Sequence, residues 1–489
     1  MGKVGFDNKK YLEMQSEKIL ERIATFGDKL YLEFGGKLFD DFHASRVLPG
    51  FEPDSKIKML STLKDKAEIL IVINACDIEK NKTRSDYGIT YDVEVLRLIE
   101  LFRNNEFYVG SVVLNCFAEQ PSAVAFKKRL EISGVKVYCH YPIEGYPSDV
   151  EKIVSETGYG KNEYIVTTRP LVIVTAPGPG SGKMATCLSQ LYHENKRGVK
   201  AGYAKYETFP VWNLSLTHPV NAAYEAATAD LNDVNMIDPF HMEAYGKMAV
   251  NYNRDIEIFP VLSSIMTKIM GKSLYKSPTD MGVNMAGDCI VDDEIVREAS
   301  KQEIIRRYYD AQIEVLKGNV GKEVVSKIDI LMQKMNISIN DRKVVPIALE
   351  KEALTGAPSA AMQLPDGRIV AGKTRNLMGA SAAVLLNSLK VLGDIDDGVD
   401  LISASVIEPV QHLKVNHMGS KNPRLHTDEI LILLAMSAVT NPYAKIALGQ
   451  ISKLKGSQFH SSVILSHVDK KTLKQLGVCV TMEPKRKKE

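Results

Sequence analysis

The stretch PLVIVTAPGPGSGKMATCLSQLYHENKRG, residues 170–198, decides the fold expected for the first part of the chain. It opens with a short apolar run rich in β-branched residues, which is typical of a strand buried on both faces. A loop rich in glycine and proline follows, and then a segment with helical periodicity. VKAGYAKYETF at 199–209 predicts the next strand. The order strand, helix, strand favours a parallel sheet, because neighbouring parallel strands need a crossover connection.

The residues before this stretch show the same alternation of helices and strands. The predicted helices cover residues 9–25 and 91–103 and a segment after Pro121, and the predicted strands cover residues 31–36, 68–77, 108–117 and 135–140. Such alternation predicts an α/β fold in which helices cover both faces of a parallel sheet. We assign residues 1–215 to this α/β domain, with a P-loop-like phosphate-binding turn in the glycine-rich loop.

The pattern changes after residue 215. Residues 216–335 are mainly helical and predict an extension of the same lobe, and residues 336–489 predict a smaller C-terminal α/β domain. The predicted elements here are a long amphipathic helix over 293–318, strands over 344–356, 362–373 (with a turn at 365–367) and 463–465, and helices over 376–391 and 428–439. Because the apolar stripes of the helical region must be buried, we predict self-association into a homo-oligomer.

The composition excludes several classes of protein. The chain has 489 residues, of which 45% are hydrophobic and 25% charged, as in ordinary globular proteins. Its 62 Lys+Arg against 60 Asp+Glu leave a formal charge of +2, which argues against a nucleic-acid binder. The longest apolar run, residues 430–439, is about half the roughly 20 residues that a bilayer span needs. With no recognisable secretion signal and six scattered cysteines, we expect a cytoplasmic protein without nucleic-acid or membrane partners.

The glycine-rich loop carries the strongest chemical signal. Five of its residues are predicted to bind phosphate: Gly178, Gly180, Ser181, Gly182 and Lys183. Glycines let successive backbone N–H groups turn toward one anion, and the start of the following helix adds a favourable dipole. Lys183 supplies a mobile positive charge and is also predicted to be catalytic. The structural alternative is a turn that only connects the strand to the helix.

The loop departs from the P-loop consensus GxxxxGK[ST] at two positions. Pro177 stands where the first glycine belongs, and Met184 stands where the consensus has the magnesium-binding hydroxyl. We therefore expect any metal to be held differently from the metal of an ordinary P-loop NTPase. A dinucleotide-binding GxGxxG loop is disfavoured, because position 183, where its last glycine belongs, is lysine.

Carboxylates elsewhere in the chain are candidate ligands for Mg²⁺. Asp280, Asn284 and Asp288 are spaced by four residues, so on a helix they would face the same way. Mg²⁺ prefers one or two carboxylates together with phosphate oxygens. We predict Asp280 and Asp288 as metal ligands, the first also as catalytic; Asp288 has the alternative role of a helix cap. Asp77 follows an apolar strand, as a Walker-B-like carboxylate would, and is the third predicted ligand.

Two further clusters suggest anion binding. His43 and Arg46 follow a predicted strand, and ligands of open α/β sheets bind beyond the carboxyl ends of strands. We predict that both residues contact an anionic substrate and act in catalysis; the alternative is a hydrogen-bonded surface pair. Lys373, Thr374 and Arg375 precede a helix with small residues in its first turn. They are predicted to bind a second anion, or else to cap that helix.

Four stretches carry a resemblance to a known family: GGKLFDDFHASRVLPGF at 35–51, TAPGPGSGKMATCLSQ at 175–190, SPTDMGVNMAG at 277–287 and GKTRNLMGASAA at 372–383. Over nearly its whole length the chain resembles a bacterial group, uncharacterised protein family 0371 or domain of unknown function 1846. The resemblance implies a cytoplasmic bacterial protein with an α/β phosphate-loop-like core and a smaller C-terminal domain. By analogy of fold, such a core suggests a metal-dependent phosphotransferase.

These observations lead to two hypotheses about function. In the first, the chain is a metal-dependent phosphotransferase acting on a nucleotide or another phosphorylated small molecule. The loop then binds the phosphates, Lys183 offsets developing charge, and carboxylates bind Mg²⁺. In the second, the chain is a non-catalytic phosphate- or nucleotide-sensing protein, and the missing hydroxyl at position 184 reflects missing hydrolysis. Mg²⁺ and a nucleotide are therefore the expected cofactors.

Overall fold

The computed structural model describes residues 4–27, 29–84 and 88–485, which form two compact units. The N-terminal unit consists of Val4–Glu225 and Asn232–Arg297. The C-terminal unit consists of Ala226–Leu231 and the chain from Glu298 onward. No helix in these described ranges is long and apolar enough to cross a membrane.

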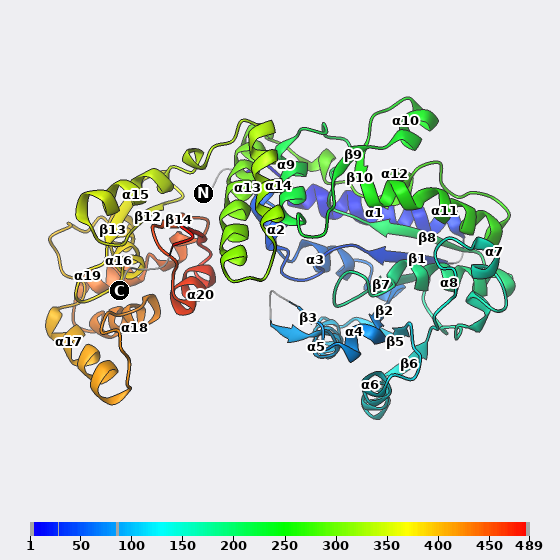
Figure 1. The fold of residues 1–489 in the computed structure, drawn as a ribbon, viewed down its shortest axis with the longest axis horizontal. Helices are drawn as coiled ribbons and strands as arrows, with labels where there is room; N and C mark the ends of the chain where they lie inside the picture. The colour runs from blue at the N-terminus through cyan, green and yellow to red at the C-terminus, as the bar shows by residue number, and fades with distance from the viewer. Residues whose placement is uncertain (1–3, 28, 85–87, 486–489) are drawn as a thin grey trace. The chain divides into compact units, whose positions relative to one another are not determined.

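A seven-stranded parallel sheet organises the N-terminal unit (Figure 1). The strands lie in the order β11-β8-β1-β7-β2-β5-β6, and each is parallel to its neighbours. Their bounds are Lys29–Phe34 (β1), Ala67–Asn74 (β2), Tyr108–Asn115 (β5), Lys136–Cys139 (β6), Leu171–Thr175 (β7), Ala201–Tyr206 (β8) and Gly282–Val283 (β11). The predicted α/β fold with a parallel sheet is therefore confirmed.

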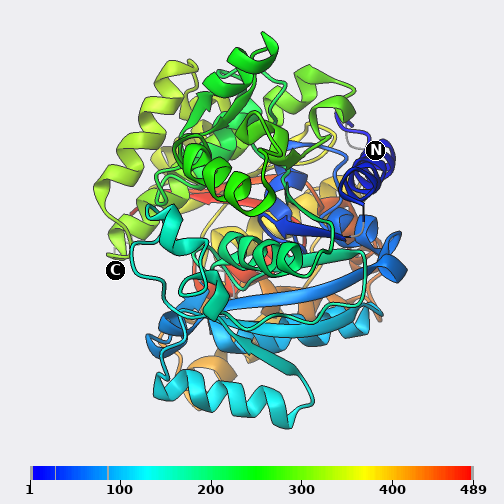
Figure 2. The ribbon, with the colours of Figure 1, turned by 90° about the vertical axis from the view of Figure 1, so that its right-hand side faces the viewer.

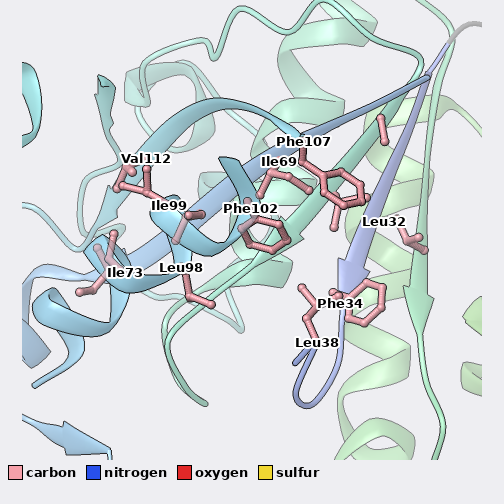
Figure 3. Packing of buried hydrophobic residues seen from close by; sticks show 14 of the residues in the cluster. Leu32, Phe34, Leu38, Ile69, Ile73, Leu98, Ile99, Phe102, Phe107 and Val112 are labelled. Atoms are coloured by element: carbon pink, nitrogen blue, oxygen red, sulfur yellow. The ribbon is translucent and has the colours of Figure 1, made fainter. Parts of the chain in front are cut away.

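Helices cover both faces of this sheet, because alternate residues of a strand point to opposite sides. Leu171 and Ile173 of β7 belong to one hydrophobic cluster, while Val172 and Val174 belong to another. The first face carries α1 (Asn8–Phe26), α3 (Ser55–Ser61), α5 (Tyr91–Asn104) and α6 (Pro121–Ile132), and the second carries α8 (Lys183–Lys196) and α11 (Asn253–Met270). Figure 2 shows the sheet with helices packed against it, and Figure 3 shows side chains of β1, β2 and α5 gathered on the first face.

Shorter elements complete the N-terminal unit. They are α2 (Phe42–Val47), α4 (Ala75–Glu79), β3 (Thr83–Arg84), β4 (Ile89–Thr90), α7 (Val150–Ile153), the start of α9 (Pro219–Ala227), β9 (Asn235–Ile237), α10 (Pro239–Tyr245), β10 (Val250–Tyr252) and α12 (Pro278–Met281).

The prediction that Asp280, Asn284 and Asp288 share one helix face is wrong. Helix α12 ends at Met281, because the next two residues pair with β8 as the edge strand β11. A 3-10 turn over Gly287–Cys289 follows. The three side chains therefore come from three different local structures.

A smaller mixed sheet organises the C-terminal unit, as predicted. Its order is β13-β12-β14-β15, in which β12 is antiparallel to both of its neighbours, and β14 and β15 are parallel. The strands are β12 (Ser359–Gln363), β13 (Ile369–Lys373), β14 (Gln458–Ser461) and β15 (Cys479–Met482). The helices are α13 (Asp293–Leu316, which begins in the other unit), α14 (Lys322–Lys334), α15 (Val344–Thr355), α16 (Ala380–Leu392), α17 (Ala404–His412), α18 (Thr427–Ser437), α19 (Pro442–Leu448) and α20 (His467–Gln475).

Two strands predicted for this unit are wrong. Residues 344–356 form helix α15, whose buried residues Val344, Val345 and Ala348 have helical spacing. Residues 463–465 follow the end of β14, where they pack against the hydrophobic cluster of the unit without extending the strand. In both segments the apolar residues serve packing, and apolarity alone does not distinguish a short strand from a buried helix or loop.

Candidate functional site

The glycine-rich loop lies at a topological switch point of the large sheet. After β1 the chain continues to α3 on one face, whereas after β7 it enters α8 on the other face. Strands β1 and β7 are direct neighbours. In open α/β sheets, ligands bind at the carboxyl ends of two such neighbouring strands. The loop at residues 176–182 is therefore at the place where this type of sheet normally binds its ligand.

The local geometry explains why each of these loop positions is glycine. Gly180 and Gly182 have φ angles of +78° and +91°, in the left-handed region that favours glycine. Gly178 has no room for a side chain, since a Cβ atom there would lie 2.2 Å from the Tyr91 hydroxyl. The backbone therefore needs glycine at all three positions.

Two asparagines at the ends of neighbouring strands hold the loop carbonyls. Asn115, the last residue of β5, donates from Nδ2 to the carbonyls of Ser181 and Gly182 at 3.0 Å each. Asn74, the last residue of β2, makes a longer contact of 3.5 Å to the carbonyl of Gly180. Because N–H and C=O point in opposite directions in a trans peptide, the N–H groups of the three following residues point away from these asparagines.

The start of α8 adds to this array of donors. Its N-cap is Gly182, which provides no side chain to cap the helix. The first N–H groups of a helix have no partner within it, and they carry the positive end of the helix dipole. Lys183 is the first residue of the helix. The sequence-predicted phosphate loop therefore has the strand, the left-handed glycines, the helix start and the lysine together.

The two hydroxyls near the loop are used within it. Ser181 is buried and donates to the carbonyl of Gly178 at 2.9 Å. Thr186 donates to the carbonyl of Gly182 at 3.0 Å and accepts from Asn115. Both hydroxyls thus stabilise the loop conformation, and neither takes the position of the hydroxyl that the P-loop consensus has at 184.

A buried charged cluster that was not predicted from the sequence lies at the same edge of the sheet. Glu33 of β1 pairs in register with Val174 of β7 and with Lys205 of β8. Lys205 forms ion pairs with Glu207, at 2.7 Å, and with Asp255. Burial raises the pKa of Glu207 to about 7, although Lys205 opposes the shift. The sequence did contain a signal: Lys205 and Glu207 are two charged residues around the end of β8, a strand that is otherwise buried.

The three predicted metal ligands lie in separate places. Asp77 of α4 pairs with Lys82 at 3.2 Å. Asp280 accepts hydrogen bonds from the Tyr245 hydroxyl and the Lys276 N–H, and Asp288 accepts a long one from Asn213. Within the described ranges, no group of three or more His, Cys, Asp or Glu side chains is arranged to bind a metal.

Of these three carboxylates, Asp77 is connected to the glycine loop. Its partner Lys82 lies over the ring of Tyr91, with Nζ 5.0 Å from the ring centre. The Tyr91 hydroxyl in turn fills the space beside Gly178. Contacts thus run from this carboxylate to the loop.

His43 and Arg46 lie on the short helix α2, which follows β1. The ring of His43 packs edge-on against Phe209 and Tyr224, at centroid distances of 5.3 and 5.4 Å. The preceding Asp41 is buried and pairs with Lys56 at 2.7 Å. His43 therefore sits in an aromatic environment.

Lys373, Thr374 and Arg375 belong to the C-terminal unit, and the glycine loop belongs to the other one. Lys373 ends β13, and the next two residues lead toward α16. The Thr374 hydroxyl accepts a hydrogen bond from the N–H of Ala380 at 3.2 Å. Thr374 thus caps the start of α16, and capping was one of the two roles predicted for this cluster.

The family of the chain follows from two matches. The family described as Domain of unknown function DUF1846, N-terminal, matches residues 4–336, and Domain of unknown function DUF1846, C-terminal, matches residues 340–489. The chain belongs to this family. UPF0371 proteins of Streptococcus pyogenes (serotype M5, strain Manfredo), Streptococcus uberis and Streptococcus sanguinis are each 56% identical to it over 484 residues, covering 99% of this chain and 98% of each relative. The resemblance seen in the sequence is confirmed.

Proposed function

We propose that this chain is an enzyme that binds a phosphorylated small molecule or nucleotide on its glycine loop and transfers a phosphoryl group with the help of Mg²⁺. One observation carries the proposal: at the switch point of the sheet, asparagine side chains hold the loop carbonyls on one side, so that consecutive N–H groups face the other. The adjoining helix start and Lys183 place further positive charge there.

The residues of this edge have separable roles in the proposed reaction. Lys183 neutralises phosphate charge that develops during transfer. Burial raises the pKa of Glu207 to about 7, so its carboxyl group exchanges a proton at neutral pH. In the proposed reaction it takes up the proton that the acceptor group releases. Strands β7, β1 and β8 are successive neighbours, so the loop and Glu207 are about 10 Å apart at a strand spacing of about 4.8 Å. A small phosphorylated molecule spans that distance.

The residues around the loop fit Mg²⁺ in part. The ion usually takes one or two carboxylates, and phosphate oxygens and waters complete its shell. Of the three predicted carboxylates, Asp77 is the one linked to the loop by contacts through Lys82 and Tyr91. To bind the metal, it would give up its ion pair with Lys82. When bound, the ion would neutralise phosphate charge. Asp280 and Asp288 have no such connection to the loop.

A second candidate function is phosphate or nucleotide sensing without catalysis. Met184 replaces the consensus hydroxyl, and the hydroxyls of Ser181 and Thr186 are both engaged inside the loop. A loop of this kind binds phosphate without the metal contact that an ordinary P-loop uses. The two functions share the binding site and differ in turnover.

A binding and turnover experiment tests both functions. The melting temperature is measured with ATP, GTP, pyrophosphate and sugar phosphates, each with Mg²⁺ or with EDTA, and ³¹P NMR follows turnover. We expect one ligand class to raise the melting temperature, since ligand binding to the native state stabilises it. Lys183→Ala should weaken binding about 10- to 100-fold, because a charge-assisted hydrogen bond contributes about 1.5–3 kcal/mol.

Lys196→Ala is the matched control, because Lys196 ends the same helix and pairs with Glu156 on the surface. It should leave binding unchanged. Magnesium-dependent turnover would support the phosphotransferase, and binding that survives EDTA without turnover would support sensing. Equal binding by wild type and Lys183→Ala would overturn both.

A further inference from the structure

A polar hollow lies inside the C-terminal unit. About 370 Å³ within its outline is free of protein atoms, and this space includes open solvent. Its lining comes from the loop before α16, from the segment before α18 and from the segment before α20. The polar residues that matter here are Thr374, Ser381, Arg424, His426, Ser466 and Asp469.

Three helices begin at this hollow. Helices α16, α18 and α20 have 13, 11 and 9 residues, and the N-cap residue of each, Gly379, His426 and Ser466, is part of the lining. Each helix start carries partial positive charge from its dipole. Their convergence makes the hollow favourable for a negative charge.

The three helix starts differ in how they are capped. In α18 the N–H of Thr427 donates to Asp469 at 2.9 Å, and in α20 the N–H of Asp469 donates to the Ser466 hydroxyl at 3.1 Å. Helix α16 begins at Gly379, which has no side-chain cap, and Thr374 accepts only the N–H of Ala380. The N–H groups of Ser381 and Ala382 bind no acceptor in the described part of the chain.

Ser381 points to a ligand independently of the helix dipole. Its exposure is 3%, it lines the hollow, and its hydroxyl makes no hydrogen bond to any described residue. Its hydroxyl oxygen is not among the fully enclosed side-chain atoms without a partner, so it opens into the hollow and can donate there. Hence this serine and the N–H groups beside it form an unused set of donors.

The lining holds one arginine and one carboxylate, and the two differ in how far their hydrogen bonds are satisfied. Arg424 donates from Nε to the carbonyl of Arg375 at 3.1 Å, and its two terminal nitrogens bind no described residue. The carboxylate of Asp469 is already engaged by His426 at 3.0 Å, by the N–H of Thr427 and by Ser466. The free donors are therefore those of Arg424 and the start of α16.

We propose that this hollow is a second anion site, which binds a phosphate group through Ser381, the first N–H groups of α16 and Arg424. Donors on several sides suit a tetrahedral oxyanion, and an arginine fork suits two of its oxygens. The predicted role of the 373–375 cluster is thereby revised: Thr374 lines the hollow, whereas Lys373 and Arg375 do not. Arg424 takes the place predicted for them.

Titration calorimetry with inorganic phosphate in chloride buffer tests the site. The full chain carries Lys183→Ala throughout, so that binding of phosphate at the glycine loop is weakened. Ser381→Ala should weaken phosphate binding about tenfold, and Arg424→Gln should weaken it at least as much. The controls are Ser388→Ala, a buried serine on the same helix, and Arg368→Gln, an arginine paired with Asp366 on the surface. Both controls should bind as the Lys183→Ala chain does.

Two results would overturn the proposal: no binding of phosphate at millimolar concentration, or equal affinity in Ser381→Ala, Arg424→Gln and their controls. Circular dichroism confirms that each variant is folded. A second titrant, glycerol phosphate, distinguishes the sources of the phosphate group. Tighter binding of the ester would identify an organic phosphate, and tighter binding of the free ion would identify inorganic phosphate; either result supports the site.

Discussion

Helices α8 and α16 begin in similar ways in two different units of the chain. Each has a glycine as N-cap, Gly182 and Gly379, and neither glycine provides a side-chain cap. Gly182 is left-handed, with a φ of +91°, and lies against Asn115. Gly379 has an extended conformation, with a φ of −72° and a ψ of 163°, and has space around it.

The two proposed anion sites therefore differ in how their donors are arranged. At α8 the proposed donors are backbone N–H groups, because the left-handed glycines and Asn115 orient the peptide groups of the loop. At α16 the backbone is ordinary, and the proposed donors are side chains from distant segments that line the hollow, above all Arg424. The first design depends on glycine itself, whereas the second depends on what surrounds it.

Replacing each N-cap glycine by alanine is the strongest test of this difference. In Gly182→Ala, a left-handed alanine costs about 1–2 kcal/mol, and its Cβ would lie 2.3 Å from Asn115 Nδ2 and displace its hydrogen bonds. We expect a total loss of about 3 kcal/mol in the free energy of unfolding. Gly379→Ala should cost under about 1 kcal/mol, because its nearest neighbours would lie 4.0 Å away.

Urea denaturation, followed by hydrogen exchange of the amides of α8 and α16, measures both losses. Equal losses at the two positions would contradict the comparison. So would a large loss confined to Gly379→Ala.

The sequence predicted the glycine loop because its parts are contiguous. The apolar strand, the glycines, Lys183 and the helix follow one another, so local pattern is sufficient. Asn115, which orients the loop, is 66 residues away from Ser181. Only the pairing of strands brings the two together, and no local pattern reports that pairing.

The same limit applies to the hollow of the C-terminal unit. Lys373 and Arg375 were predicted as anion ligands because they precede a helix with small residues in its first turn, whereas the arginine that lines the hollow is Arg424, from a distant segment. The common helix face predicted for Asp280, Asn284 and Asp288 was wrong for a related reason, since a fixed spacing places side chains together only if the helix continues. The domain boundaries and self-association stay predictions.

The asparagines provide a second test, of how the loop is held. Asn115→Ala removes three hydrogen bonds, to Ser181, Gly182 and Thr186. We expect a loss of about 2 kcal/mol in unfolding free energy and about tenfold weaker binding of the loop's phosphate ligand. Asn74→Ala removes the 2.9 Å cap bond to Cys76 and only a 3.5 Å contact to the loop. It should cost about 1 kcal/mol and leave the affinity within about twofold.

Calorimetry of the two variants separates stability from affinity. If Asn74→Ala weakened binding as much as Asn115→Ala, the loop would depend on both strands equally. That result would contradict the assignment of its orientation to Asn115.

Acid should weaken the starts of α18 and α20, which line the same hollow as the start of α16, and leave the start of α8 unaffected. The hydrogen bonds that Asp469 accepts from His426, Ser466 and Thr427 lower its pKa to about 2, although burial opposes the shift. Its ordinary value is about 3.9. A carboxyl with a lowered folded-state pKa stabilises the fold above its unfolded value, and this stability is lost as pH falls toward 2. The contribution is about 2–3 kcal/mol.

Asp469→Asn should therefore lower the unfolding free energy by that amount at neutral pH, and the difference from wild type should shrink as pH falls and vanish only below pH 2. Asp366→Asn is the control: Arg368 also lowers the pKa of that carboxyl, but the pair is on the surface, where such pairs contribute at most about 1 kcal/mol and salt screens them. Denaturation at several pH values, read from the amides of α18, measures both variants. An acid response that persisted in Asp469→Asn would mean that another group holds these helix starts, and the role given to Asp469 in the hollow would be wrong.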